Sequence, residues 1–404
     1  MSKISVHDSW VILAGYLAAI HVGKLSAVIP ILQQDLGLSF TQAGFSLSLV
    51  QGAGMLFALS IGAFSEKFGL KRCLILALTI LGFSSIAGLW IQHVAALYFF
   101  RFTEGIGFLT ISLCAPAILK RISRPEHLNF KMGLWSSYMG VGVSLAVLCI
   151  PILLEWLQWQ TIWVLLGGLC LLIALMVHRY LHLEPQVPTS ETASSSAISS
   201  SFWEIVRVTI THPPILCLAV IFACYTSQWL TVIGFLPSMY VANQIDLKTA
   251  GMLASLVVVS NLGGTFGAGM LLQRGWQPKT LLWTGFISMM LTSFLAFAAR
   301  SWLMLELQVL SAVLFSLIGG IIPTTVFAIT LKYAPQANTA AASVGLVLQV
   351  SAFAQFFVPP LSASLVSATG QWANIALVTA CLSILGLMMS SYLFRRHGKY
   401  KEPQ

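Results

Sequence analysis

The sequence predicts an all-α membrane protein with twelve transmembrane helices in two pseudo-symmetric six-helix bundles. Charged residues make up only 8% of the chain and the mean hydropathy is +0.88, whereas soluble proteins carry about 25% charged residues. Twelve apolar segments reach the length of about 20 residues that a helix needs to cross a bilayer. The first six segments also resemble the last six at a constant offset of 207 residues.

The twelve segments fall into two sets separated by a polar stretch. The first set lies near residues 9–32, 41–64, 73–92, 95–118, 132–154 and 160–180. The second set lies near residues 214–240, 248–272, 279–299, 302–330, 339–364 and 372–394. The stretch between them is rich in serine, a composition typical of flexible linkers. We therefore expect an N-terminal six-helix bundle at residues 1–180, a cytoplasmic linker at 181–212 and a C-terminal six-helix bundle at 213–404.

The offset of 207 residues aligns prolines and glycines of the two halves. It pairs Pro30 with Pro237, Gly44 with Gly251, Gly62 with Gly269, and Pro116 with Pro323. A parallel duplication of this kind predicts two halves of similar structure.

The basic residues predict the orientation. With a cytoplasmic N-terminus, the inner segments hold seventeen Lys and Arg residues, and the outer loops hold only Lys248 and Arg300. Basic residues accumulate on the cytoplasmic side of membrane proteins. We therefore expect a multi-pass protein of the bacterial inner (plasma) membrane with both termini in the cytoplasm.

Composition and motifs exclude several other classes of function. The net charge of +9 would suggest nucleic acid in a soluble protein, but here it reflects topology, and we expect no nucleic-acid partner. The seven cysteines are scattered without metal-ligand spacing. A membrane enzyme or signalling protein would need a catalytic motif such as HExxH or a nucleotide loop, and the sequence has neither. We expect no enzyme activity, no metal and no cofactor.

A charged, glycine-containing loop is predicted between the second and third helices. Its sequence is Gly62-Ala-Phe-Ser-Glu66-Lys67-Phe-Gly69-Leu-Lys71-Arg72. It resembles the loop signature of the major facilitator superfamily of transporters, with Glu66 and Lys67 where the family most often has Asp and Arg. The resemblance implies that this loop is a conformational latch in which Glu66 contacts the second half and holds the outward-facing state. The alternative is a solvated turn whose charge serves orientation only. The latch residues are Gly62, Glu66, Lys67, Gly69 and Arg72.

The fourth helix carries a second motif, Arg101-Phe-Thr-Glu104-Gly105-Ile-Gly107, which resembles the family's pattern of an Arg followed by two glycines. A buried Arg is costly in hydrocarbon and needs a partner or a watery cavity. Glu104 lies three residues on, hence on the same helical face. The pair either pins helix 4 to a neighbour or takes part in a proton relay or substrate clamp.

The first helix holds His21 and Lys24. Lys24 lies about 22 Å along this helix, at the same depth as Arg101 and Glu104. The resemblance implies that helices 1, 4, 7 and 10 line a central cavity, where these residues would meet. Lys24 snorkelling outward and His21 as a packing residue are the alternatives. We expect Glu104 and His21 to couple transport to protons.

The second half places no charge opposite these residues, since the repeat aligns His21 with Gln228 and Lys24 with Thr231. It offers amides and aromatic rings instead. Each of these is singly more often a helix-packing residue than a ligand. The expected substrate-binding set is His21, Lys24, Gln51, Arg101, Tyr138, Tyr225, Gln228, Trp229, Asn261 and Gln349.

A finer resemblance is to the cyanate and nitroimidazole transporter group. It rests on the run from Pro116 to Arg121, on the run from Met132 to Gly140, and on Trp159-Gln160. Members of that group carry an Arg in helix 1, where this sequence has Val22.

The predicted function is proton-coupled secondary transport of a small molecule by alternating access. Lys24 and Arg101 would set a positive field that favours an anionic substrate; if Lys24 is salt-bridged to Glu104, the field largely cancels and a neutral substrate fits. The alternative is multidrug or siderophore efflux by proton antiport. Helix 5 lacks the Gly-Pro-Gly-Gly cluster of many exporters, which favours uptake. The expected partners are the substrate, protons and the lipid bilayer, with the protein a monomer.

Overall fold

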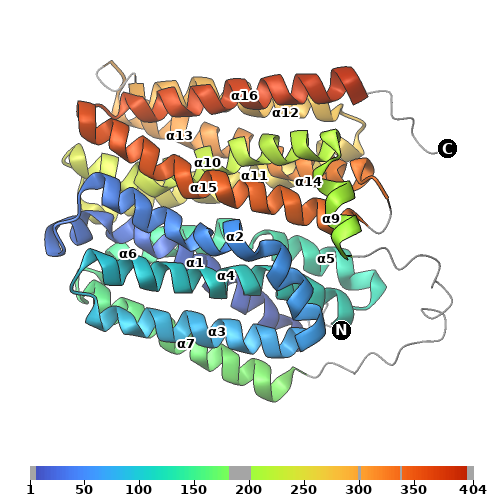
Figure 1. Cartoon of the computed structure of the whole chain (residues 1–404). Coiled ribbons are helices and arrows are strands. Elements are labelled where there is room, and N and C mark those ends of the chain that lie inside the picture. The colour runs from blue at the N-terminus through green and yellow to red at the C-terminus, as the bar shows by residue number, and fades with distance from the viewer. Residues whose placement is uncertain (1–5, 182–201, 299–301, 337–338, 398–404) are drawn as a thin grey trace.

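The computed structural model describes residues 6–181, 202–298, 302–336 and 339–397, and this part of the chain is helical without any strand. Figure 1 shows the long helices running side by side across the molecule. Helix α1 begins, and α16 ends, at the end of the molecule where α9 lies (Figure 1). We refer to this end as the linker end and to the opposite one as the far end.

The first half contains six passes built from seven long helices. Helices α5 and α6 meet at Ser137 and form one broken pass. The helices are α1 (Val6–Asp35), α2 (Phe40–Phe68), α3 (Leu70–Ile86) with a short turn η1 (Ala87–Trp90), α4 (Val94–Ile122), α5 (Pro125–Ser136), α6 (Tyr138–Leu153) and α7 (Trp159–Tyr180).

The second half repeats this plan. Helices α13 and α14 form its broken pass, with Gly320 between them. The helices are α9 (Phe202–Ile210), α10 (Pro213–Ala242), α11 (Leu247–Gln273), α12 (Pro278–Ser293) with a π-helical turn η2 (Phe294–Ala298), α13 (Leu305–Gly319), α14 (Ile321–Tyr333), α15 (Ala340–Thr369) and α16 (Ala373–His397).

Ten helical stretches among the described residues are long and apolar enough to cross a membrane. Helix α2 and the broken helix α5–α6 run alongside them (Figure 1), which gives twelve passes. The predicted all-α membrane fold is therefore confirmed.

The predicted loop from Gly62 to Arg72 is wrong in its local structure. Helix α2 continues to Phe68 and α3 begins at Leu70, so Gly69 alone separates them. Gly69 has φ 102°, a backbone conformation that glycine adopts without steric cost. Gly62, Glu66 and Lys67 thus lie in α2 and Arg72 lies in α3; the side chains of Glu66 and Lys67 lie outside the described residues.

Part of the predicted linker at 181–212 is helical. Residues 182–201 lie outside the described part of the chain, but Phe202–Ile210 form helix α9. This nine-residue stretch is mostly apolar and contains neither glycine nor proline, so it forms a helix that contacts α10 and α15. The boundaries of the two bundles stay a prediction.

The duplication reappears in the contacts between the halves. Helix α2 packs on α15, and α11 packs on α6. A Cβ on Gly44 would lie 2.8 Å from Cα of Pro360, and a Cβ on Gly251 would lie 2.5 Å from the carbonyl oxygen of Val147. Gly44 and Gly251 are equivalent in the repeat. Both are therefore needed where helices of different halves approach closely.

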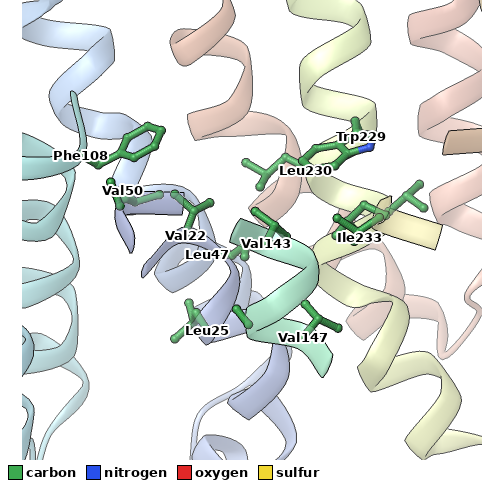
Figure 2. Packing of buried hydrophobic residues seen from close by; sticks show 14 of the residues in the cluster. Val22, Leu25, Leu47, Val50, Phe108, Val143, Val147, Trp229, Leu230 and Ile233 are labelled. Atoms are coloured by element: carbon green, nitrogen blue, oxygen red, sulfur yellow. The ribbon is translucent and has the colours of Figure 1, made fainter. Parts of the chain in front are cut away.

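The two halves also share one apolar cluster. Val22 and Leu25 of α1, Leu47 of α2, Val143 of α6 and Ile233 of α10 all belong to it, and Figure 2 shows Val143 between the α1 residues and Ile233. Ser26 on α1 donates hydrogen bonds to the carbonyl oxygens of Ile233 (2.9 Å) and Gly234 (3.0 Å). Because Ser26 and Ile233 are equivalent in the repeat, α1 and α10 meet close to the pseudo-twofold axis.

Candidate functional site

Four ionisable side chains meet inside the first half. Lys24 Nζ lies 2.5 Å from Glu104 Oε1, and Arg101 Nη1 lies 2.6 Å from Glu104 Oε2. Lys24 Nζ is also 3.1 Å from His21 Nδ1. All four residues are completely buried. We call this set the charged cluster.

Helical spacing and a small residue bring the charged cluster together. His21 and Lys24 are three residues apart on α1, and Arg101 and Glu104 are three apart on α4, so each pair shares a helical face. Next to Glu104, Gly105 lets the backbone of α4 approach Val50 on α2. The expectation that these four residues lie at one depth agrees with these distances.

The charged cluster points toward the outer helices of the first half. Lys24 donates a hydrogen bond to Ser85 Oγ on α3 (2.9 Å), and its Nζ lies 4.0 Å from the ring centroid of Trp163 on α7. Cys170 Sγ, also on α7, is 3.3 Å from His21 Nε2. Lys24 therefore does not snorkel outward. The cluster lies between α1, α3, α4 and α7 and does not face the central cavity that the family resemblance had implied.

Ser85, Trp163 and Cys170 were missed by sequence reasoning. Serine, cysteine and tryptophan are common in apolar helices, and neither the spacing nor the repeat singles them out. The Ser85 hydroxyl in turn donates a hydrogen bond to the carbonyl oxygen of Trp163 at 2.7 Å. The chain from Glu104 through Lys24 to Ser85 thus ends on the backbone of α7.

The charges of the cluster do not balance. Glu104 is one acid between two cations, so one positive charge remains on the pair of Lys24 and Arg101. Arg101 also donates to the carbonyl oxygens of His21 (2.9 Å) and Ser46 (3.3 Å), while its buried Nη2 has no hydrogen-bond partner in this structure. The salt bridges to Glu104 therefore cancel one of the two positive charges, and the predicted positive field is reduced but not removed.

An uncharged polar cluster lies in the second half. Asn261 Nδ2 on α11 donates to Tyr225 Oη (3.0 Å) on α10 and to the carbonyl oxygen of Ser316 (2.8 Å) on α13. Trp229 Nε1 donates to Ser316 Oγ at 3.2 Å. Trp229 belongs to the apolar cluster shared by both halves (Figure 2). The structure thus brings Tyr225, Trp229 and Asn261 together.

Gln228 belongs to a different environment from its neighbour Trp229. Its Nε2 donates to the carbonyl oxygen of Cys224 (2.8 Å), and its Oε1 accepts from Ser383 Oγ on α16 (3.0 Å). Gln228 is completely buried. It therefore faces an outer helix of the second half, as its repeat equivalent His21 faces an outer helix of the first.

The remaining predicted site residues lie on α2, α5–α6 and α15. Gln349 Nε2 on α15 donates across the halves to the carbonyl oxygen of Met55 on α2 at 3.0 Å, while its buried Oε1 has no partner in this structure. Gln51 is buried on α2, one turn before Met55. The Tyr138 ring stacks on Trp135 with centroids 4.6 Å apart.

The far end of the molecule holds the halves together. The Phe40 ring centroid lies 4.7 Å from that of Phe235 and 5.2 Å from that of Trp372. Lys248 of the second half forms a 3.1 Å ion pair with Glu155 of the first. With the hydrogen bonds of Ser26, these contacts close this end.

The fold and the repeat agree with a family comparison. The sequence profile of the Major Facilitator Superfamily matches residues 11–354 and, in a second match, residues 217–404. The chain belongs to the Major Facilitator Superfamily. This superfamily consists of transporters and not of enzymes, which confirms those two predictions from the loop motif and the missing catalytic motifs.

Curated relatives are distant. The chain is 28% identical over 169 residues to the methyl viologen resistance protein SmvA of Salmonella typhimurium, covering 40% of this chain and 33% of that protein. It is 24% identical over 267 residues to the uncharacterized transporter YycB of Bacillus subtilis (65% and 62% covered). It is 22% identical over 257 residues to a probable 4-methylmuconolactone transporter of Cupriavidus pinatubonensis (62% and 58%). The chain thus spans from a third to about three fifths of these relatives.

Solved structures show the same fold over nearly the whole chain. A bacterial homolog of the human lysosomal transporter Spinster, inward-facing and occupied, matches with a TM-score of 0.77 at 14% identity, covering 98% of both chains. The D-xylose–proton symporter matches with a TM-score of 0.74 at 15% identity, covering 96% of both. At these identities the likeness concerns the fold alone.

Proposed function

We propose that this protein is a proton-coupled secondary transporter that moves a small molecule by alternating access. The observation that carries the proposal is Glu104, a fully buried carboxylate held between Lys24 and Arg101 and in contact with His21. Ionisable groups at membrane depth are costly and are typical of proton relays and substrate pathways. Among the described helices, Asp8 is also buried and ion-paired, but it pairs with Lys131 near the beginning of α1 and not between two cations.

Protonation of Glu104 would change the cluster from one net positive charge to two. Lys24 and Arg101 would then be buried cations without a counter-ion, which is unfavourable unless the helices move apart and admit water. Because Ser85 and Trp163 anchor Lys24 to α3 and α7, this rearrangement would act on the packing of α1. Proton binding would thus be linked to movement of the helix that meets α10.

The uncharged second half supports a neutral substrate. Tyr225, Trp229 and Asn261 present two aromatic rings, a hydroxyl and an amide, and the charged cluster, which keeps one net positive charge, faces α3 and α7 instead. Buried amides and hydroxyls recognise polar groups by hydrogen bonds, and aromatic rings bind flat apolar surfaces. We therefore propose a neutral or weakly charged organic substrate with ring character, in place of the anionic substrate favoured by the sequence.

Multidrug or siderophore efflux by proton antiport is the second candidate. The similarity to a methyl viologen resistance protein favours efflux of organic compounds over uptake. The stacked pair Trp135 and Tyr138 adds aromatic surface in the first half. The distant likeness to a probable 4-methylmuconolactone transporter supports the leading proposal of a dedicated carrier.

Orientation and location remain proposals of the same kind. The distribution of basic residues supports a bacterial inner membrane location with both termini cytoplasmic. The linker end would then be the cytoplasmic end, and the far end, where the halves are closed, would face the outside. The monomeric state, the latch at Gly62 to Arg72 and the resemblance to the cyanate and nitroimidazole group stay predictions, and the substrate proposal does not rest on them.

The first experiment measures proton movement in proteoliposomes under an imposed pH gradient, with pools of neutral aromatic compounds, organic anions, siderophores and cationic dyes. A response to one neutral class supports a dedicated carrier, and responses to many unrelated dyes support the multidrug exporter. Glu104→Gln should abolish the proton signal, whereas Glu104→Asp, which keeps a titratable carboxylate, should retain part of it.

Two controls separate proton coupling from folding. Exposed Glu306 at the start of α13 is the matched site, and Glu306→Gln should leave the proton signal unchanged. Substrate counterflow, which needs no net proton movement, should persist in Glu104→Gln. A normal proton signal in Glu104→Gln would rule out Glu104 as the coupling group.

A further inference from the structure

A groove opens on the second half at the linker end, away from both polar clusters. It has a volume of about 730 Å³ and lies between the beginning of α12 and the ends of α14 and α16. Lys279 and Arg395 contribute basic groups to its lining, and Trp283, Tyr333 and Phe394 contribute aromatic rings. The groove thus combines cations with aromatic surface at the ends of membrane-spanning helices.

A second groove of about 700 Å³ continues from the first along α12. The two share Lys279 and Trp283, and the second extends past Ile287 to Leu291. Residues 283, 287 and 291 repeat every four positions, so they line one face of α12. These side chains are exposed (37%, 40% and 56%), although the helix is a membrane span. This furrow therefore faces hydrocarbon.

The basic groups at the mouth of the groove are not neutralised by the protein. Lys279 and Arg395 are exposed, and neither forms an ion pair with an acidic side chain that the structure describes. Lys279 Nζ instead lies 4.8 Å from the ring centroid of Trp283. A cation over an indole ring at a helix end is suited to the level of lipid headgroups. The mouth therefore offers positive charge to an anion.

We propose that this groove binds one anionic phospholipid. Its phosphate would contact Lys279 and Arg395, its glycerol region would lie against Trp283 and Phe394, and one acyl chain would follow α12 past Ile287 and Leu291. Basic pockets between helices at the cytoplasmic side recognise anionic headgroups, and buried methylene groups add binding energy. The occupant is a lipid rather than a soluble phosphate because the polar mouth continues directly into the apolar furrow.

The site is independent of the proposed substrate. Its residues come from α12, α14 and α16, whereas the polar clusters lie on α1, α4, α10, α11 and α13. A bound lipid would link the linker-end half of the broken helix α13–α14 to its two neighbours. It would therefore stabilise the second half at that end.

The test is a lipid titration of the delipidated protein in detergent, with native mass spectrometry reading the first binding event. The probes are phosphatidylglycerol and phosphatidylcholine with identical dioleoyl chains. Each basic residue near a headgroup contributes about a fivefold gain in affinity, so the wild-type protein should prefer phosphatidylglycerol by about 25-fold. Lys279→Gln combined with Arg395→Gln should reduce the affinity for phosphatidylglycerol to that for phosphatidylcholine.

The matched control removes the same two charges from the same end of the first half. Lys120 and Arg124 are exposed there, and the double variant Lys120→Gln with Arg124→Gln should keep the preference for phosphatidylglycerol. Trp283→Ala should lower the affinity for both lipids by similar factors, because Trp283 would contact the glycerol region and acyl chains that the two lipids share. No preference in the wild-type protein, or an equal loss in the control variant, would overturn the proposal. Displacement of the lipid by glycerol phosphate at similar concentration would also overturn it, in favour of a soluble phosphate.

Discussion

At the scale of single residues, Glu104 is the point on which both ion pairs of the first half converge. Its two carboxylate oxygens serve different cations, Lys24 at 2.5 Å and Arg101 at 2.6 Å. Loss of Lys24 leaves Glu104 paired with Arg101, but loss of the Glu104 charge leaves two buried cations. The variants of these residues should therefore differ in severity.

Glu104→Gln should lower the free energy of unfolding by about 3–5 kcal/mol, because removing one partner of a buried pair leaves uncompensated charge. Lys24→Met should lower the free energy of unfolding clearly less. The double variant of Lys24→Met and Glu104→Gln should be more stable than Glu104→Gln alone. Unfolding curves in detergent, followed by circular dichroism, measure these differences. Equal stability of Glu104→Gln and the wild-type protein would mean that the cluster contributes nothing to folding.

At the scale of elements, α11 begins at a cap that was not singled out in the sequence. The Asp246 carboxylate accepts a hydrogen bond from the backbone nitrogen of Thr249 at 2.8 Å. Hydrogen bonds from the side chain and backbone of Thr249 lower the pKa of the Asp246 carboxyl below its ordinary value. Asp246 precedes the membrane span and is accessible to water, so its titration can be measured.

Asp246→Ala should destabilise the protein at neutral pH, and this difference from the wild-type protein should vanish in acid. Because the pKa is lowered on folding, the contribution is present above the unfolded value of about 3.9 and is lost as pH falls through the folded value. Asp246→Asn should keep the cap and lose its dependence on pH. Thermal unfolding at pH 7 and pH 3 tests this. A wild-type advantage over Asp246→Ala that is equally large at both pH values would contradict it.

At the scale of the whole molecule, the two halves meet through contacts that the repeat makes twice. Gly44 on α2 lies against Pro360 of α15, and its equivalent Gly251 on α11 lies against Val147 of α6. The ion pair between Lys248 and Glu155 is about 40% exposed on each side, so it adds at most about 1 kcal/mol. Close packing at the glycines therefore dominates the closure of the far end.

Gly251→Val should shift the protein toward a state that is open at the far end. Overpacking costs about 1–3 kcal/mol, which changes the ratio of two conformations by a factor of about 5 to 150. Double electron–electron resonance between spin labels on the two halves at that end measures the separation. Gly267→Val on the same helix is the control, since a Cβ there meets no atom within 4 Å. A separation unchanged in Gly251→Val would show that these glycines do not control closure.

The candidate site shows how far sequence reasoning reaches. The motif on α4 and the charges on α1 correctly predicted that Lys24, Arg101 and Glu104 lie at one depth, because helical rise fixes depth from residue number. The direction in which Lys24 points was not predicted. The same holds for Gln228, which contacts α16, whereas the adjacent Trp229 contacts α13. In a soluble protein the polar face of a helix indicates its exposed side. A membrane helix is apolar on all sides, because lipid is as apolar as a packed leucine.

The sequence by itself determined the class of the protein. Twelve apolar segments, the offset of 207 residues and the scarcity of charge together specified a duplicated helical membrane protein, because hydrocarbon accepts only helices or closed barrels and sets their length. The tertiary structure alone decided that Ser85, Trp163 and Cys170 surround the charged cluster and that Lys279 lies in one groove with Arg395. These arrangements join residues from helices far apart in the chain, and only the packing of those helices sets which side chains meet.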